Sequence, residues 1–192
     1  TNFFEKFHLP VEYQTVSNQL YNDNPYLKKL NSKKGCWWNL QDYSHMSLLR
    51  LCFRLNLEVT ELRRHSPKDF LEPFPTFIDE GLIKAGSIIE LPEWKRTFKN
   101  QQIMSVRSVD NIGIQLDDFA AFCIARSQWI MAKTDPGKLL TQADQHIFSC
   151  VSKFNAPNLA WFKVDPKNFS RDTYEFVLMR DRKNRGLKFK PT

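Results

Sequence analysis

Two adjacent carboxylates, Asp117 and Asp118, stand near the start of an otherwise apolar, helix-forming run, and no other feature constrains the fold and function more. Residues 119–124 read Phe-Ala-Ala-Phe-Cys-Ile, which leaves the expected helix little polar surface beside the acids. The positive end of a helix macrodipole favours acidic residues in the first turn. A charge at the edge of a core is nevertheless costly unless it meets a cation or a metal ion. Two interpretations are therefore open, a complement to the helix dipole and a metal site.

Composition predicts a folded chain without a membrane segment. A length of 192 residues suits one domain, and we expect a single α/β domain over residues 1–192. The chain contains 16 Phe and 5 Trp, which excludes a disordered protein. Its four cysteines form no Cys-x-x-Cys pair and show no ligand spacing with histidine, so we expect free thiols in the reducing cytoplasm rather than zinc. No apolar run is long enough to span a membrane, and we expect no membrane partner.

The formal net charge of +7 predicts an acidic partner, above all nucleic acid. Basic residues gather in two places, one near Trp37 and Trp38 and one at the C-terminal end, residues 180–192: Lys28, Lys29, Lys33 and Lys34, and Arg180, Arg182, Lys183 and Arg185. Basic side chains neutralise phosphates and aromatic rings stack on bases, which favours nucleic-acid binding. Solvated basic tails and a protein partner are the alternatives.

Hydrophobic periodicity predicts a mixed central sheet flanked by helices. One helix should begin after Asp42 as its N-cap and end before Ser66-Pro67; two more should cover Asp117 to about 132 and about 138–154. In the last of these we expect His146 to be a packing residue rather than a ligand. We expect strands at 12–16 and 103–106 and a buried strand at 74–78. Residues 87–91 fit a strand or an extended link, and residues 161–164 and 174–178 fit terminal strands or capping elements.

Carboxylates from distant parts of the chain should meet at one edge of this sheet. Asp79 and Glu80 directly follow the strand at 74–78, at the carboxyl edge where α/β proteins bind ligands. Mg²⁺ and Mn²⁺ favour oxygen ligands, and two such ions can hold the attacking and leaving oxygens of a phosphodiester cleavage. We predict a Mg²⁺ or Mn²⁺ site with Asp79 and Asp118 as ligands. Glu80 or Asp117 would supply a further ligand or orient water.

The order of these strands and polar residues along the chain resembles that of a known family. A Phe-Ile-Asp-Glu strand end at 77–80, a strand at 103–106, Ser108 in the next loop and Gln-Leu-Asp-Asp-Phe at 115–119 follow one another. Residues 75–126 in this way resemble the bacterial family catalogued as domain of unknown function 3800, which looks like a ribonuclease-H-type α/β fold. The resemblance places Asp118 at the family's helix aspartate and Asp117 where the family has alanine.

That resemblance implies a ribonuclease-H-like fold and a metal-dependent nuclease. It implies that Ser108 and Gln115 position substrate or water, and that Arg126, at the family's later helix arginine, faces a phosphate or braces a carboxylate. The family's first strand, which carries Asp-Glu-Ser-Gly, has no counterpart in this sequence. We therefore expect either a preceding strand outside this sequence or a divergent, inactive relative.

Two other functions compete with this one. Asp79 followed by Glu93-Trp94-Lys95 is similar to the aspartate and Glu-x-Lys pattern of restriction-type nucleases, although Pro92 argues against a central strand there. The second is a non-catalytic module that binds nucleic acid or protein, in which the acidic pair only caps a helix.

Overall fold

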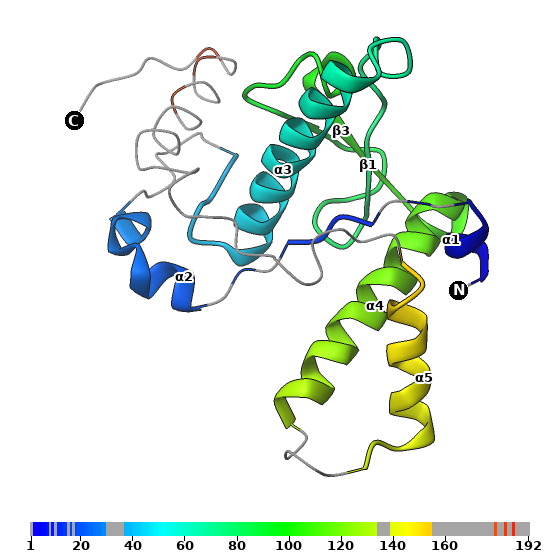
Figure 1. The fold of residues 1–192 in the computed structure, drawn as a ribbon. Helices are drawn as coiled ribbons and strands as arrows, with labels where there is room; N and C mark the ends of the chain where they lie inside the picture. The colour runs from blue at the N-terminus through cyan, green and yellow to red at the C-terminus, as the bar shows by residue number, and fades with distance from the viewer. Residues whose placement is uncertain are drawn as a thin grey trace. The chain divides into compact units, whose positions relative to one another are not determined.

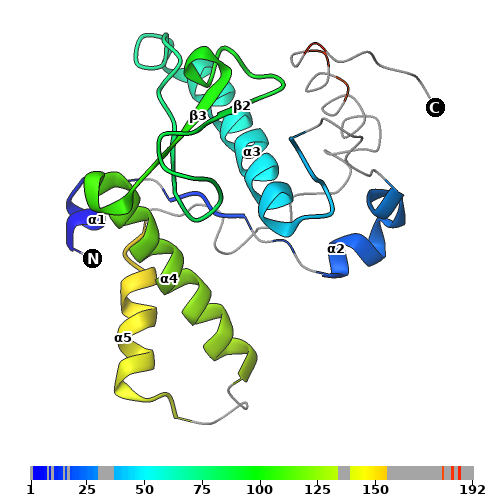
Figure 2. The ribbon, with the colours of Figure 1, turned by 180° about the vertical axis from the view of Figure 1, so that it is seen from behind.

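The computed structural model describes residues 2–7, 9, 11–14, 16, 18–29, 37–133 and 139–154, together with 179, 183 and 186. Its contacts divide the chain into two compact units (Figures 1 and 2). Unit 1 contains the described residues of 1–13 and 107–162, and unit 2 contains those of 14–106 and 163–192. The single domain expected over residues 1–192 stays a prediction, and each unit is described by itself.

The architecture is mixed α/β, as the sequence predicts. Within the described residues, unit 2 contains α2 (Asn18–Asp23), η1 (Pro25–Lys29), α3 (Tyr43–His65), β1 (Phe77–Asp79), β2 (Ile88–Glu90), η2 (Lys99–Gln101) and β3 (Gln102–Val106), where η marks a 3₁₀ helix. Unit 1 contains α1 (Asn2–Phe7), η3 (Ser108–Asp110), α4 (Ile112–Lys133) and α5 (Gln142–Val151). No helix among the described residues is long and apolar enough to span a membrane.

Both ends of α3 lie where the sequence predicts them. The Asp42 carboxylate caps the helix by accepting hydrogen bonds from the backbone N–H groups of Ser44 (2.8 Å) and His45 (3.2 Å). At the other end, the Ser66 N–H still donates to the Leu62 carbonyl at 2.7 Å. Pro67 follows immediately, and the residue before a proline avoids the helical region.

The sheet has three short strands in the order β1-β3-β2. β1 is parallel to β3, with Asp79 opposite Val106, whereas β2 is antiparallel to β3, with Ile89 opposite Ile103. The strand predicted over 74–78 is present, but it begins at Phe77 and is not buried. Phe74 forms only an isolated bridge, and β1 covers Phe77–Asp79 at the edge of the sheet, because Pro75 has no N–H for a ladder.

The remaining strand predictions have different outcomes. Residues 11–14 and 16 are not part of a strand, so the strand expected at 12–16 was wrong for these positions. Residues 161–164 and 174–178 lie outside the described residues. β2 and β3, in contrast, lie within one residue of the predicted 87–91 and 103–106.

The core of unit 2 lies between α3, the sheet and the segment that precedes α3. Trp38 is fully buried, and its indole N–H donates to the Glu90 carbonyl of β2 at 3.3 Å. Its core neighbours are also apolar: Leu27, Leu40, Met46, Leu49, Leu91 and Phe98. Trp38 is therefore not available for base stacking, contrary to the expectation. The half-buried Trp37 stacks on the ring of His45 at a centroid distance of 4.2 Å.

In unit 1, α4 and α5 lie side by side as a helical hairpin, green and yellow in both views (Figures 1 and 2). Phe4 of α1 packs on the buried face of the hairpin with Ala120, Cys123 and Cys150. α5 begins four residues later than the predicted residue 138, because the hydroxyl of Thr141 caps it by accepting from the Asp144 N–H. His146 is solvent-exposed, so its predicted packing role was wrong.

Candidate functional site on helix α4

Helix α4 begins earlier than the acidic pair suggests. The Asn111 side-chain oxygen accepts from the N–H groups of Gly113 (2.9 Å) and Ile114 (3.3 Å), which is the geometry of an N-cap. Asp117 and Asp118 consequently lie in the second turn of α4, and the first turn contains no acid. The prediction of a helix opening at Asp117 was wrong, because a local asparagine cap already satisfies the first N–H groups.

The acidic pair projects into solvent rather than into the core. Both side chains are exposed, and none of the described cations forms an ion pair with either of them. Partial desolvation by neighbouring groups raises the pKa of Asp117, and the negative charge of Asp118 raises it further. The pair thus carries two like charges without a described counter-charge, and Asn111 is the residue that caps the helix.

Several of the predicted site residues lie on one exposed face of α4. A helix turns by about 100° per residue, so positions three and four apart share a face. The residues that follow this spacing are all exposed: Gln115, Asp118, Phe122, Arg126, Trp129 and Lys133. We call this set the α4 stripe. It joins Gln115, Asp118 and Arg126, which the sequence singled out, to aromatic residues that it did not.

Sequence reasoning missed Phe122 and Trp129, although their spacing could have revealed them. About half of each side chain is exposed, 59% for Phe122 and 51% for Trp129, although Phe and Trp are usually well covered. The guanidinium carbon of Arg126 lies 4.3 Å from the centroid of the Trp129 ring, a cation–π contact. An arginine stacked on an exposed indole offers both a charge and a flat apolar surface.

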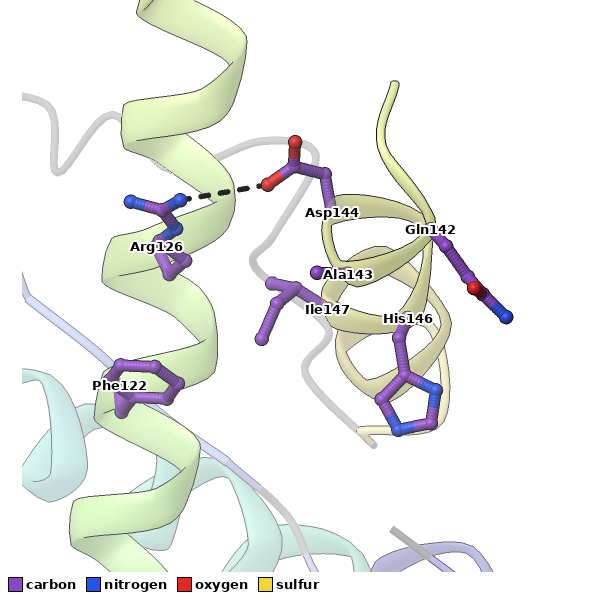
Figure 3. A pocket seen from close by; sticks show the side chains of 7 residues that line it. All are labelled: Phe122, Arg126, Gln142, Ala143, Asp144, His146 and Ile147. Atoms are coloured by element: carbon purple, nitrogen blue, oxygen red, sulfur yellow. Dashed lines mark ion pairs between the residues drawn. The ribbon is translucent and has the colours of Figure 1, made fainter. Parts of the chain in front are cut away.

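Arg126 also faces helix α5 across a groove (Figure 3). Its Nη2 lies 3.6 Å from Oδ1 of Asp144, while Oδ2 of Asp144 accepts from the Thr141 hydroxyl at 2.7 Å. The groove is open, has a volume of about 750 Å³, and is lined by Phe122, Arg126, Gln142, Ala143, Asp144, His146 and Ile147. Figure 3 shows Asp144 directed from α5 toward Arg126, and Gln142 directed away from α4. Arg126 therefore contacts the Asp144 carboxylate, whereas its expected role at a phosphate or a carboxylate of the metal site stays a prediction.

The predicted positioning residues Ser108 and Gln115 are in contact. Nε2 of Gln115 donates to the backbone carbonyl of Ser108 at 2.9 Å. Ser108 opens η3, the short turn that leads from β3 to α4. The Gln115 amide thus ties this turn to the helix, while the rest of the Gln115 side chain stays exposed on the α4 stripe.

Asp79 is the last residue of β1 in unit 2, and its side chain is half-buried. Its Oδ1 is shielded from solvent and accepts no hydrogen bond from the described residues. A Cβ at Gly81 would lie 3.7 Å from Oδ2 of Asp79, so the glycine leaves space beside the carboxylate. The next residue after Asp79, Glu80, is exposed.

Asp79 and Asp118 belong to different units, so their predicted shared metal ion stays a prediction. No three His, Cys, Asp or Glu residues of the described part cluster as metal ligands would.

The alternative Glu-x-Lys site does not have the predicted setting. Residues 93–95 form part of a turn after β2, as Pro92 suggested, and not a strand. Lys95 instead lines a second groove, in unit 2, together with Arg63 and Arg96, and none of the lining residues is acidic. The lysine of this pattern thus faces other cations rather than a carboxylate.

Most of the net charge lies outside the described residues. The described residues contain 17 Lys and Arg and 16 Asp and Glu, whereas the remaining residues contain 11 and 5. Arg180, Arg182 and Arg185 are among the latter, and Lys183 is described as exposed. The net positive charge of the chain therefore comes from residues 30–36 and 155–192 more than from the described residues.

Comparison with protein-family models, with curated protein sequences and with solved structures finds no match to this chain. The resemblance of residues 75–126 to domain of unknown function 3800 consequently stays a prediction.

Proposed function

We propose that this protein is a nucleic-acid-binding module whose α4 stripe contacts a single strand. The observation that carries this proposal is the exposed indole of Trp129 with the Arg126 guanidinium stacked on it. Proteins that bind single strands combine aromatic stacking platforms with arginine and lysine along the backbone. The α4 stripe contains both, since Phe122 and Trp129 alternate with Arg126 and Lys133.

The geometry of the stripe suits an extended ligand. Phe122 and Trp129 are seven residues apart, about 10 Å along the helix axis at 1.5 Å per residue. Arg126 lies between them, so a base stacked on either ring would bring a phosphate near the guanidinium. Asp118 would repel phosphates at the other end, which favours the Arg126–Lys133 half as the contact. The net charge of +7 supports the same class of partner.

Substitution of Trp129 tests the proposal. Removing a stacking side chain costs about 1–3 kcal/mol per base, so Trp129→Ala should weaken binding of a fluorescent single-stranded oligonucleotide by roughly 5- to 150-fold. Met131→Ala is the matched control, because Met131 is also apolar and exposed but lies on the opposite side of α4. Fluorescence anisotropy at fixed salt measures both.

Three further results test whether the α4 stripe binds nucleic acid. Lys133→Gln should lower the salt dependence of binding by about one counterion, whereas Trp129→Ala should leave it unchanged. Asp118→Asn should strengthen binding, because it removes a negative charge beside the ligand. Equal affinities of Trp129→Ala and Met131→Ala, or no saturable binding at low salt, would reject the nucleic-acid proposal and favour a protein partner for this aromatic face.

A metal-dependent nuclease with a ribonuclease-H-like fold is the second candidate, and one observation favours it. Oδ1 of Asp79 is shielded from solvent without a described hydrogen-bond donor. A buried carboxylate oxygen in that state is stabilised by a cation. In this candidate Asp79 and Asp118 hold Mg²⁺ or Mn²⁺, and Glu80 or Asp117 orients water.

The nuclease candidate makes predictions opposite to those of simple binding. Mn²⁺ should raise the melting temperature of the wild-type chain by linkage, and Asp79→Asn and Asp118→Asn should each abolish that increase. Glu72→Gln, which removes an exposed acid from a different loop, should retain it. An increase that survives both aspartate variants would exclude these residues as the metal ligands.

A further inference from the structure

A second groove, in unit 2, has a strongly cationic lining. It lies between the end of α3, the loop that follows α3 and the turn after β2, and its volume is about 490 Å³. The residues that line it are Arg63, Pro67, Phe70, Leu71, Pro73, Lys95 and Arg96. Three of these are cations, four are apolar, and none is acidic. We call it the Arg63 groove.

Arg63 holds the two walls of the groove together. Its Nε donates to the Phe70 carbonyl at 2.5 Å, and its Nη2 donates to the Arg96 carbonyl. The side chain is half-buried, and a charged donor strengthens both of these hydrogen bonds. Arg63 thus cross-links the loop after α3 to the turn after β2. Its positive charge remains in the lining of the groove, because carbonyl acceptors do not neutralise it.

The turn that carries Lys95 and Arg96 is held in one conformation. Trp94 has φ of 76°, in the left-handed region that non-glycine residues rarely adopt. Its ring packs on Phe53 and Phe98, and its carbonyl accepts from the N–H groups of Thr97 (2.9 Å) and Phe98 (3.0 Å). The turn therefore positions Lys95 and Arg96 on one wall before any ligand arrives, which lowers the entropic cost of binding.

The two outer cations have no described counter-charge. Lys95 and Arg96 are both exposed, and neither forms an ion pair with a carboxylate of the described residues. In contrast, the neighbouring Arg64 is paired with Glu61 at 2.8 Å. Three cations that converge on one concave surface repel one another, and an anion placed between them relieves this repulsion.

We infer that the Arg63 groove binds a phosphate group of the nucleotide class. Lys95 and Arg96 would contact the phosphate oxygens, with the Arg63 charge behind them. The opposite wall is apolar, since Phe70 and Leu71 stand between two prolines and Leu71 is 71% exposed. A ligand with a planar, weakly polar part beside its phosphate fits both walls. This site lies in unit 2, goes beyond the proposed function and does not depend on the α4 stripe.

The experiment uses the full chain and three probes: adenosine monophosphate, inorganic phosphate and adenosine. Isothermal titration calorimetry should give the tightest binding for adenosine monophosphate, weaker binding for phosphate and none for adenosine. Lowering the pH from 7.5 to 5 should weaken the binding of adenosine monophosphate, because its phosphate gains a proton near pH 6. Equal affinities for phosphate and adenosine monophosphate would overturn the nucleotide assignment.

A matched pair of double variants tests the residues. Lys95→Gln/Arg96→Gln should weaken the binding of adenosine monophosphate by about tenfold or more. The control Lys84→Gln/Lys99→Gln removes the same charge from exposed positions of unit 2 outside the groove and should bind as the wild type does. Equal affinities of the two double variants, or no saturable binding to the wild type, would overturn the proposal.

Competition identifies the source of the nucleotide. If excess adenosine monophosphate displaces a single-stranded oligonucleotide from the Trp129→Ala variant, the groove takes its phosphate from nucleic acid. If the oligonucleotide stays bound or never binds, while adenosine monophosphate still binds, the groove takes a free nucleotide. Both results retain the site, and both separate it from the fate of the α4 stripe.

Discussion

The asparagine cap of α4 can be tested by replacing Asn111 with alanine. The substitution removes the oxygen that accepts from the Gly113 and Ile114 N–H groups at 2.9 and 3.3 Å. Loss of an N-cap typically costs about 1 kcal/mol, within a range of roughly 0.5–2. We expect a value near the middle of that range, because Gly113 is exposed and water can replace part of the lost bonding.

Hydrogen exchange of individual amides is the appropriate assay, because it reports the first turn of α4 directly. A cost of about 1 kcal/mol corresponds to roughly fivefold faster exchange at Gly113 and Ile114. The melting temperature should fall by about 2–4 °C if unfolding is cooperative. Asn111→Ser retains a capping oxygen and should restore most of the protection.

The result distinguishes two positions for the start of the helix. If α4 began at Asp117, as the acidic pair alone suggests, Asn111→Ala would leave all amide exchange unchanged. Asp118→Asn would then lower stability by removing a favourable interaction with the helix dipole. Unchanged exchange at Gly113 and Ile114 in Asn111→Ala would therefore refute the cap and restore the original interpretation.

Three other outcomes follow from burial and charge. The pKa of Asp117 is raised in the folded chain, so ionisation of this side chain destabilises the fold at neutral pH. Asp117→Asn should therefore stabilise the protein at pH 7, and this gain should vanish as the pH falls below the ordinary pKa of aspartate. A gain in stability that persists at pH 3 would contradict this cause. Trp38→Ala should reduce the free energy of unfolding by about 3–5 kcal/mol in denaturant titrations, because the side chain is fully buried, and a loss under 1 kcal/mol would be inconsistent with that packing. Burial raises the pKa of the Cys52 thiol, so a thiol reagent should modify Cys52 only at the rate of unfolding, and immediate modification would disprove its burial.

Helix ends and strands that depend on a few neighbouring residues were predicted well. Asp42 and Ser66-Pro67 mark both ends of α3, because a cap and a proline act within one turn. The strands β2 and β3 were recognisable from short apolar runs between turn residues. Asn111 is a capping residue of the same kind, but the prediction placed the start of α4 at the acidic pair Asp117 and Asp118, five residues too late.

Exposure was the property that the sequence did not reveal. Trp38 and Trp129 are the same residue type, yet Trp38 is fully buried and about half of Trp129 is exposed. Which tryptophan packs on β2 and which remains in solvent depends on contacts between elements distant in the chain. The Arg63 groove has the same origin, because its cations come from α3 and from a turn more than 30 residues later.

Local patterns alone thus indicate the presence of α3, α4 and α5, two of the three strands and the mixed α/β class, since capping, periodicity and turn chemistry act over a few residues; they did not predict α1 and α2. Only the tertiary structure places Arg126 against Asp144 and Trp129, leaves an oxygen of Asp79 without a hydrogen-bond partner among the described residues and gathers Arg63, Lys95 and Arg96 around one groove. These arrangements arise from packing between segments far apart in sequence, and no pattern within a single segment encodes the distance between two side chains.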